Sequence, residues 1–349
     1  MTPGLAEIAA VTTVHAESLT ARVADAEFRA GSLRALRERL ADTLYRTLHQ
    51  GAAGTAAHPR DLSDDAFVAD LRSAVPHAVC RVPARHTEAA GVRGDEVTVV
   101  LNGVRVAVPR ALVRPASPGN TAPGDDDVTV ELPPCRPALS PGFLAVLGSR
   151  QPPAGTAPVL RVYLHIARAE AARTVWGRTL RVLEDLRIPY QAKALAHPSR
   201  YPRKDAMVVY LSGRTDIALR ALADTAANAP GGDLADAVSP FARRIAPGVS
   251  IAWEPHPEPG AVRRPSFGQH RARAYADGLV DHSLHGTPLT ESVARALRAA
   301  GADPDRPYRN RDSPSVAPMT LRPADAGHGR RDGGTRETEE TAIRTQEER

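Results

Sequence analysis

The feature that most constrains the fold of this chain is a change in hydrophobic period near residue 95. Before it, the leucines of "SLRALRERLADTLYRTLHQ" (32–50) recur every three or four residues, which is the spacing of an amphipathic helix. After it, "EVTVVLNGVRVAVPR" (96–110) alternates apolar and polar residues around Asn102-Gly103, a dipeptide typical of a tight β-hairpin. The chain therefore combines helical segments with antiparallel strands.

Capping residues predict where the N-terminal helices begin and end. Ser32 precedes the leucine repeat as an N-cap, and Gly51 follows it as a stop. A second helix is expected in "LSDDAFVADLRSAV" (62–75), with Ser63 as its N-cap. The side chains expected on the buried stripe of the first helix are Leu33, Leu36, Leu40, Leu44 and Leu48. Residues 1–94 are thus predicted to form an N-terminal helical region.

The second half of the chain alternates between strand and helix patterns. The expected strands are 159–166, 189–195, 206–212 and 249–255, and the expected helices are 167–186, 215–227, 266–280 and 287–304. The last helix is expected to take Thr290 as its cap. Residues 138–158 are rich in Pro and Gly, which predicts a connection and a boundary near residue 155. The fold class expected is α+β, with a mixed or antiparallel sheet and packed helices over residues 95–312.

Composition narrows the function classes. The chain is 42% hydrophobic, has no apolar run of the roughly 20 residues that a membrane span requires, and lacks the pattern of a signal peptide. We therefore expect a cytoplasmic protein without a membrane partner. Cys80 and Cys135 are too few for a metal site and are expected to be free thiols. The charged residues 313–349 hold few large apolar side chains, which predicts a disordered tail.

The net charge of +5 invites a nucleic-acid hypothesis, but the arginines are spread over the chain and only 4% of residues are aromatic. A site for a small anionic ligand fits the charge equally well. Among 45 Lys and Arg residues, only Lys193 and Lys204 are lysines. A buried Lys can lose its proton and act as a base, which Arg cannot do near neutral pH. The alternative is that codon usage favours Arg and that the two lysines carry no function.

Alternation along the expected strands groups several polar side chains. In "RVYLHI", Tyr163 and His165 share one face, and in "YQAKAL" Lys193 points to one face with Gln191. If these strands are neighbours, Lys193 and His165 project from the same face of the sheet. Arginines bind phosphate and lower the pKa of a nearby Lys, while a protonated His can supply a proton to a leaving oxygen. The alternatives are a structural His165 and a solvated or salt-bridged Lys204 at the sheet edge.

Five segments carry a family resemblance: "LSPGFL", "RVYLHI", "PYQAKALAHPSRYPRKDAMVVYL", "SFGQHRARAYADGL" and "AGADPDRPYRN". Together they resemble the HopA-type type III effector family over about residues 95–312. The resemblance is closest to the members that serve as lyase components of class V lanthipeptide and thioamitide synthetases. This family is in turn distantly similar to phosphothreonine lyases, which eliminate phosphate without a metal or other cofactor.

The resemblance implies roles for particular residues. Lys193 corresponds to the base that removes the α-proton and His165 to the acid that protonates the departing phosphate. The implied phosphate and substrate ligands are Arg200, Arg203, Arg271, Tyr210 and Tyr163. One departure is Tyr163, because the phosphothreonine lyases carry a lysine two residues before the catalytic histidine. This departure leaves two questions open: how the phosphate is bound, and whether this chain is a catalytically silent relative of the lyases.

The function implied is elimination of phosphate from phosphoserine or phosphothreonine of a ribosomal precursor peptide, which gives dehydroalanine or dehydrobutyrine. The implied partners are the phosphorylated peptide and a kinase, with a cyclase as a further candidate. Two alternatives belong to other classes: a non-catalytic scaffold that binds a leader peptide or the kinase, and a nucleic-acid-binding protein. Release of phosphate from a phosphorylated peptide distinguishes the lyase from both.

Overall fold

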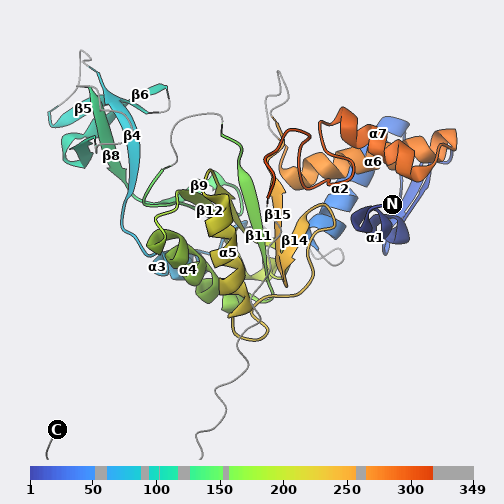
Figure 1. Ribbon diagram of the computed structural model, residues 1–349, viewed down its shortest axis with the longest axis horizontal. Helices are drawn as coiled ribbons and strands as arrows, with labels where there is room; N and C mark the ends of the chain where they lie inside the picture. Colours follow the sequence, from blue (N-terminus) through green and yellow to red (C-terminus); the bar gives the residue numbers. More distant parts are fainter. Residues whose placement is uncertain are drawn as a thin grey trace, which may run out of the picture.

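The computed structural model describes residues 1–51, 61–87, 94–101, 103–116, 126–151, 157–256 and 265–316. Three regions lie side by side in Figure 1: a small β-sheet, a central sheet flanked by helices, and a helical region that contains the N-terminus. The fold is α+β, as the sequence predicted. Residues 317–349, which hold most of the predicted tail, lie outside the described residues, whereas Ser313 is buried against the body.

The central sheet has seven strands, and every neighbouring pair is antiparallel. Across the sheet the strands are β14 (Arg243–Ala246), β15 (Val249–Trp253), β11 (Leu160–Ile166), β13 (Arg203–Leu211), β12 (Tyr190–Leu195), β10 (Phe143–Leu147) and β9 (Cys135–Ser140). Strands β11, β13 and β12 lie at its centre. The segments with the clearest strand patterns in the sequence therefore have a paired strand on both sides.

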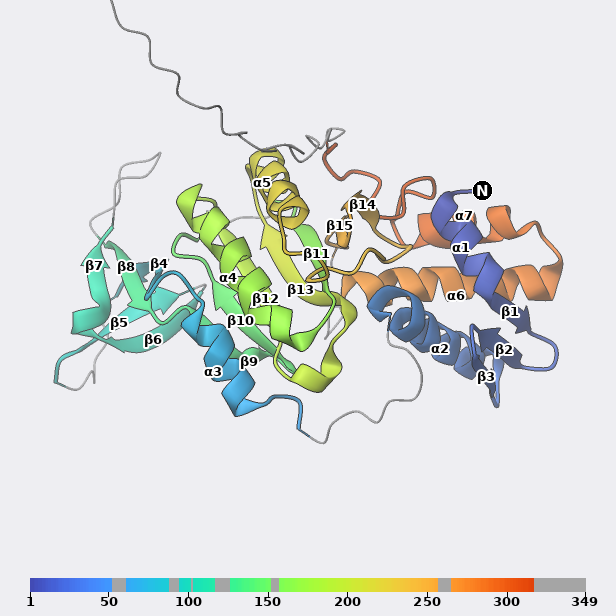
Figure 2. The ribbon, with the colours of Figure 1, turned by 90° about the horizontal axis from the view of Figure 1, so that it is seen from below.

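One face of this sheet is apolar and is covered by α3 (Asp65–Ser73), α4 (Ala169–Asp185) and α5 (Thr215–Ala227). Figure 2 shows α4 and α5 lying across this face. The sequence predicted both helices. The apolar side chains by which α4 packs on the sheet are all buried, and they are Ala172, Val175, Trp176, Leu180 and Leu183. Burial of this many apolar side chains makes this layer the main core of the molecule.

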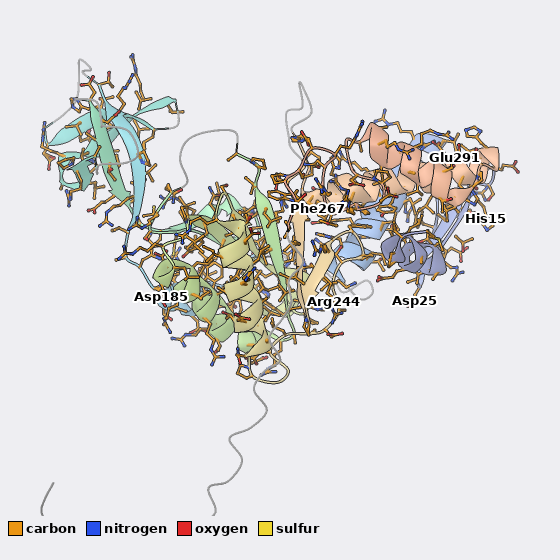
Figure 3. All side chains as sticks on the ribbon, viewed as in Figure 1. His15, Asp25, Asp185, Arg244, Phe267 and Glu291 are labelled. Carbon is orange, nitrogen blue, oxygen red and sulfur yellow. The ribbon has the colours of Figure 1, made fainter. Side chains whose placement is uncertain are left out.

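The opposite face of the sheet meets a second core built by the N-terminal and C-terminal segments. Its helices are α1 (Pro3–Val11), α2 (Leu33–Leu44), α6 (Phe267–His285) and α7 (Leu289–Ala299), together with a three-stranded sheet of β1 (Thr12–His15), β2 (Thr20–Val23) and β3 (Ala26–Arg29). The three short strands were not predicted. Figure 3 labels Phe267 at the start of α6, where this helical region reaches the central sheet. The two ends of the chain therefore cooperate to cover one sheet face.

A separate five-stranded sheet precedes the central one along the chain. Its strands, in spatial order, are β6 (Val104–Pro109), β5 (Glu96–Leu101), β4 (Cys80–His86), β8 (Asp127–Leu132) and β7 (Val113–Pro115), and a short 3-10 turn, η2 (Arg110–Leu112), precedes β7. Strands β5 and β6 form the predicted hairpin, with Glu96 opposite Pro109 and Leu101 opposite Val104. At its turn Gly103 has a positive φ, and Asn102 lies outside the described residues.

Several predicted details need correction. Residues 138–158 do not form only a connection, because β9 and β10 run through their first half. The N-caps are Asp64 rather than Ser63 for α3, and Pro288 rather than Thr290 for α7. Ser32 does cap α2 and Gly51 does adopt a left-handed conformation, but Leu33 is exposed. The Pro and Gly residues of this segment predicted a loop, whereas pairing with neighbouring strands stabilises β9 and β10.

Cys80 and Cys135 are free thiols, as predicted. In the described part of the chain, no helix combines the length and the apolar character needed to cross a membrane. Over the same residues, no group of three or more His, Cys, Asp or Glu side chains is arranged as a metal site.

Candidate functional site

The second face of the central sheet carries two adjacent rows of side chains. In one row Lys193 lies opposite Val208, which lies opposite Tyr163. In the next row Gln191 lies opposite Tyr210, which lies opposite Arg161. Because paired residues in an antiparallel sheet point to the same side, Lys193, Tyr163, Tyr210 and Arg161 share one face. The predicted proximity of polar side chains on β11, β12 and β13 is therefore present.

Lys193 lies in a sheltered environment at the middle of β12. Its Nζ donates to the Ser140 hydroxyl at 3.2 Å and lies 4.2 Å from the centroid of the Phe143 ring. Lys193 makes no salt bridge with any described carboxylate. Burial, assisted by the positive charge of Arg161, lowers the pKa of Lys193 to about 8. At pH 7 about a tenth of Lys193 is consequently neutral, far more than for an exposed lysine.

Two predicted arginines follow the carboxyl end of β12, and they differ in their contacts. Arg203 is buried and forms a two-point ion pair with Asp205, with N···O distances of 2.8 and 2.7 Å. Arg200, in the 3-10 turn η3 (Pro198–Arg200), is half-buried, and its guanidinium makes no hydrogen bond or ion pair with the described residues. Burial, together with the positive charge of Arg203, lowers the pKa of Arg200. Arg200 is thus a cation whose donors are available to an anion.

Arg161 and Glu254 form a second buried ion pair on this face. Arg161 Nη2 donates to Glu254 at 2.7 Å, and Nε donates to the other carboxylate oxygen. The guanidinium carbon lies 5.1 Å from the centroid of Tyr210. This ion pair holds Arg161 in the row beside Lys193, where its positive charge lowers the pKa of Lys193.

His165 lies at the end of β11, on the side of Lys193 toward Arg200. Its Nδ1 is 2.7 Å from the Ala237 carbonyl oxygen, so Nδ1 carries a proton and Nε2 is the second ring nitrogen. Burial lowers the pKa of His165, partly offset by this hydrogen bond. An anion bound near the ring would raise the pKa again, because it favours the charged imidazolium.

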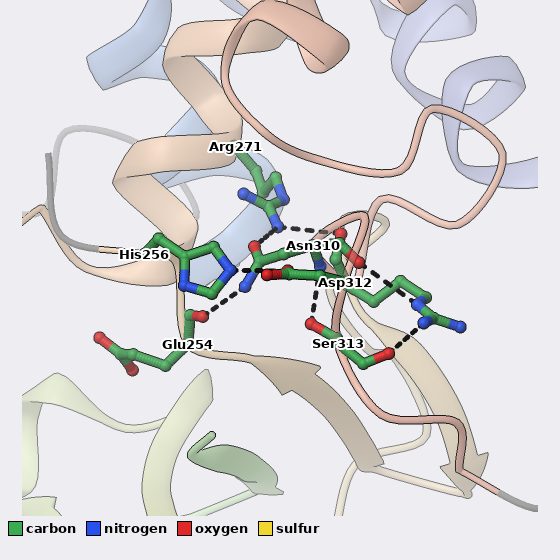
Figure 4. A network of polar contacts seen from close by, with 7 residues as sticks. Glu254, His256, Arg271, Asn310, Asp312 and Ser313 are labelled. Carbon is green, nitrogen blue, oxygen red and sulfur yellow. Dashed lines mark hydrogen bonds and ion pairs between the residues drawn. The ribbon is translucent and has the colours of Figure 1, made fainter. Parts of the chain in front are cut away.

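Arg271 is close enough to Tyr163 for their charges to interact, but its own hydrogen bonds are structural. It is completely buried in α6, and Figure 4 shows it beside Asn310 in the segment that follows α7. Its guanidinium donates to the carbonyl oxygens of Pro307 and Arg309 and to Asn310 Oδ1. The same segment continues to a His256–Asp312 pair at 2.7 Å. Most donors of Arg271 are therefore engaged in holding residues 307–310 against the helix.

Lys204 also differs from its expected surroundings. It was expected to be solvated or salt-bridged, but it is half-buried and donates to the Leu48 carbonyl oxygen at 3.1 Å. Leu48 belongs to η1 (Tyr45–Gln50), a π-helical turn that continues α2. Lys204 thus ties β13 to this turn, whereas Lys193 lies among the arginines.

The family comparison bears on this same part of the chain. The model of the HopA1 effector protein family matches residues 135–309, which is half of the chain, and the match begins at the first residue of β9. The chain belongs to the HopA1 effector protein family. The matched residues include the whole central sheet and α6, and they exclude α2, η1 and the five-stranded sheet. Lys193, His165, Arg200 and Arg203 all lie within the family match.

Two solved structures resemble this member of the HopA1 family. The effector protein from Pseudomonas syringae pv. tomato strain DC3000 has a TM-score of 0.45 and 16% identity, over 81% of this chain and 91% of that one. The effector protein from Pseudomonas syringae pv. syringae strain 61 has a TM-score of 0.38 and 16% identity, over 48% of this chain and 62% of that one. The chain thus spans less than two thirds of the strain 61 effector. No curated protein sequence matches the chain.

Sequence reasoning missed the contribution of the π-helical turn, which lies outside the family match. His49 in this turn is buried, packs edge-on against Tyr163 with centroids 5.3 Å apart, and contacts Ser239 through Nδ1 at 2.9 Å. A Cβ on Gly268 would lie 2.2 Å from the His49 ring, so only glycine allows α6 to approach. Burial lowers the pKa of His49 to about 4, which keeps the ring neutral at pH 7.

Asp205 and Glu254 were the other omissions. Asp205 lies two residues after Arg203 on β13, and that spacing places both on one side of a strand, so it could have been found from the sequence. Glu254 follows β15 directly and is distant in sequence from Arg161, so only the strand order reveals their pairing. Both carboxylates neutralise arginines, which leaves Lys193 and Arg200 as the cations of the site without a carboxylate partner among the described residues.

Proposed function

We propose that this protein is a phosphoserine/phosphothreonine lyase that acts on a ribosomal precursor peptide. The reaction class comes from the resemblance of HopA-type proteins to phosphothreonine lyases. The observation that supports it best is the environment of Lys193, a buried amine with a pKa of about 8 and no carboxylate partner among the described residues. An amine that is partly neutral at pH 7 is suited to removing a weakly acidic proton.

The proposed reaction is a β-elimination. Neutral Lys193 takes the α-proton of the phosphorylated residue, and the electrons of that C–H bond form the Cα=Cβ double bond. The Cβ–O bond breaks, and the electron pair leaves with the phosphate, which accepts a proton from His165 Nε2. Phosphothreonine thereby yields dehydrobutyrine, and phosphoserine yields dehydroalanine. Lys193 then releases its proton to water, and His165 takes up a proton from water, which restores both groups.

The arrangement along β12 supports this division of labour. Arg200 and His165 lie toward the carboxyl end of β12 and β11, and Gln191 lies on the other side of Lys193. A phosphate at Arg200 would have a guanidinium ligand that no described carboxylate neutralises, and it would favour protonated His165. Because Arg200 and protonated His165 supply positive charge at the phosphate, the proposed reaction uses no divalent ion. Arg271 is left with a structural role in this scheme.

The partners follow from the substrate. A kinase must first place phosphate on Ser or Thr of the peptide, because elimination needs phosphate as the leaving group. A cyclase can act later, because dehydroalanine and dehydrobutyrine are electrophiles that add thiols. These partners are part of the proposal and rest on the family resemblance.

The experiment is to incubate the full chain with a synthetic phosphothreonine peptide and to measure released phosphate and peptide mass. We expect release of one phosphate for each residue that loses about 98 Da, the mass of H₃PO₄, and we expect excess EDTA to leave the rate unchanged. Phosphate release without a mass loss of this size would indicate hydrolysis rather than elimination. Peptide binding without any release would favour the non-catalytic scaffold.

A further inference from the structure

A hollow of about 250 Å³ lies at the start of β12, beside the candidate site. Its walls include Val159, Pro189, Gln191, Tyr210, Ser212 and Glu254. A single water needs only about 10–15 Å³ of such space, so the hollow has room for a side chain of a ligand. None of the roles assigned above uses this space.

The hollow and Arg200 lie on opposite sides of Lys193. Gln191 precedes Lys193 by two residues on the same face of β12, which places the two about 6.5 Å apart along the strand. Arg200 follows the other end of β12. A peptide with its phosphate at Arg200 and its α-carbon at Lys193 would therefore place a neighbouring residue at the hollow.

The chemistry of the lining selects among side chains. Glu254 is already neutralised by its two-point contact with Arg161. None of the other lining residues carries a charge at neutral pH; they are Val159, Pro189, Tyr190, Gln191, Tyr210 and Ser212. A charged side chain would lose hydration here without gaining a partner, whereas an apolar one would be sheltered from water.

We infer that this hollow is a specificity pocket that binds an uncharged, mainly apolar side chain one or two residues from the phosphorylated residue of the substrate peptide. This inference rests on the proposed function for the identity of the ligand. It adds that sites flanked by a residue such as Leu are preferred over sites flanked by Gly, Glu or Lys.

Equilibrium binding tests the pocket without relying on turnover. The probes are fluorescent phosphothreonine peptides in which each of the two residues on either side is varied in turn among Gly, Leu, Glu and Lys. Binding is measured on the Lys193→Arg chain, which retains the positive charge and does not consume the peptide under the proposed mechanism. At one flanking position, Leu should bind about 10-fold more tightly than Gly, and Glu and Lys should bind no more tightly than Gly.

Two variants fill the hollow and one serves as the control. Ser212→Trp, and independently Gln191→Trp on the exposed side of the same wall, should reduce the Leu preference to within about twofold. Ile217→Trp adds the same ring at an exposed position of α5 and should keep the preference. Melting curves establish that each variant is folded.

The outcomes separate this inference from the proposed function. No Leu preference at any flanking position, or a preference that both filled variants retain, would overturn the pocket. A preference that both filled variants lose supports the pocket even if the wild-type chain eliminates no phosphate, in which case the lyase proposal alone fails. If no phosphopeptide binds, both fail.

Discussion

The two faces of the central sheet use the same strands for different purposes. On β11, Leu164 packs into the core under α4, and the next residue, His165, points to the polar face. On β12, Ala192 belongs to the same core, and Lys193 follows it toward the arginines. Alternation along β11 and β12 thus places His165 and Lys193 directly beside residues of the main core.

The partners of the buried arginines explain why the polar face tolerates their charges. The apolar face contains a continuous cluster of aliphatic and aromatic side chains. On the polar face each buried arginine has neutralising or hydrogen-bonding partners: Arg203 has Asp205, Arg161 has Glu254, and Arg271 has backbone carbonyls. A buried charge without such partners would destabilise the fold. For Lys193 this cost is smaller, because its lowered pKa leaves part of the amine neutral at pH 7.

The largest expected contrast comes from two neighbouring residues of β11. His165→Ala should slow elimination by roughly 10²–10⁴-fold, because it removes the proposed acid, while the melting temperature changes little. Leu164→Ala should do the opposite: it should cost about 2–5 kcal/mol of unfolding free energy through a cavity in the core. Its rate per folded molecule should remain near that of wild type.

Urea unfolding and mass-based elimination assays on the same preparations measure both effects. If His165→Ala lost stability as severely as Leu164→Ala and kept its rate, His165 would be a structural histidine. The two faces would then not differ in the way described above.

A smaller effect is expected from pH, and it is clearest in the His165→Ala variant, where only the base still titrates near neutrality. The neutral fraction of Lys193 rises from about a tenth at pH 7 to about nine tenths at pH 9, because its pKa is about 8. The residual elimination rate should therefore increase roughly tenfold over this range. A rate that stays flat or falls from pH 7 to pH 9 would argue against Lys193 as the base.

Much of this arrangement could be predicted from local sequence patterns. Alternation in "RVYLHI" and "YQAKAL" placed His165 and Lys193 on faces that the sheet does bring together, and helical periodicity found α4, α5 and α6. These signals are local because each depends on the spacing of side chains along one element.

The remainder depends on contacts between distant segments. Strands β9 and β10 lie in a segment whose Pro and Gly residues are typical of a loop. Their strand structure depends on the pairing of β9 with β10 and of β10 with β12. His49 reaches Tyr163 because α2 continues as a π-helical turn, which no residue pattern indicated. Arg271 resembled a phosphate ligand in sequence, but the segment after α7 folds back to occupy its donors.

Lys193 is tested as the base by replacing the two lysines one at a time and measuring dehydrated peptide by mass. Lys193→Arg keeps the positive charge but cannot release a proton near neutral pH, so it should still bind the phosphopeptide and form no dehydrated product. Lys204→Arg can still donate to the Leu48 carbonyl and should retain the wild-type rate to within about twofold. Normal turnover by Lys193→Arg would show that Lys193 is not the base. Loss of activity in Lys204→Arg alone would make Lys204 the base.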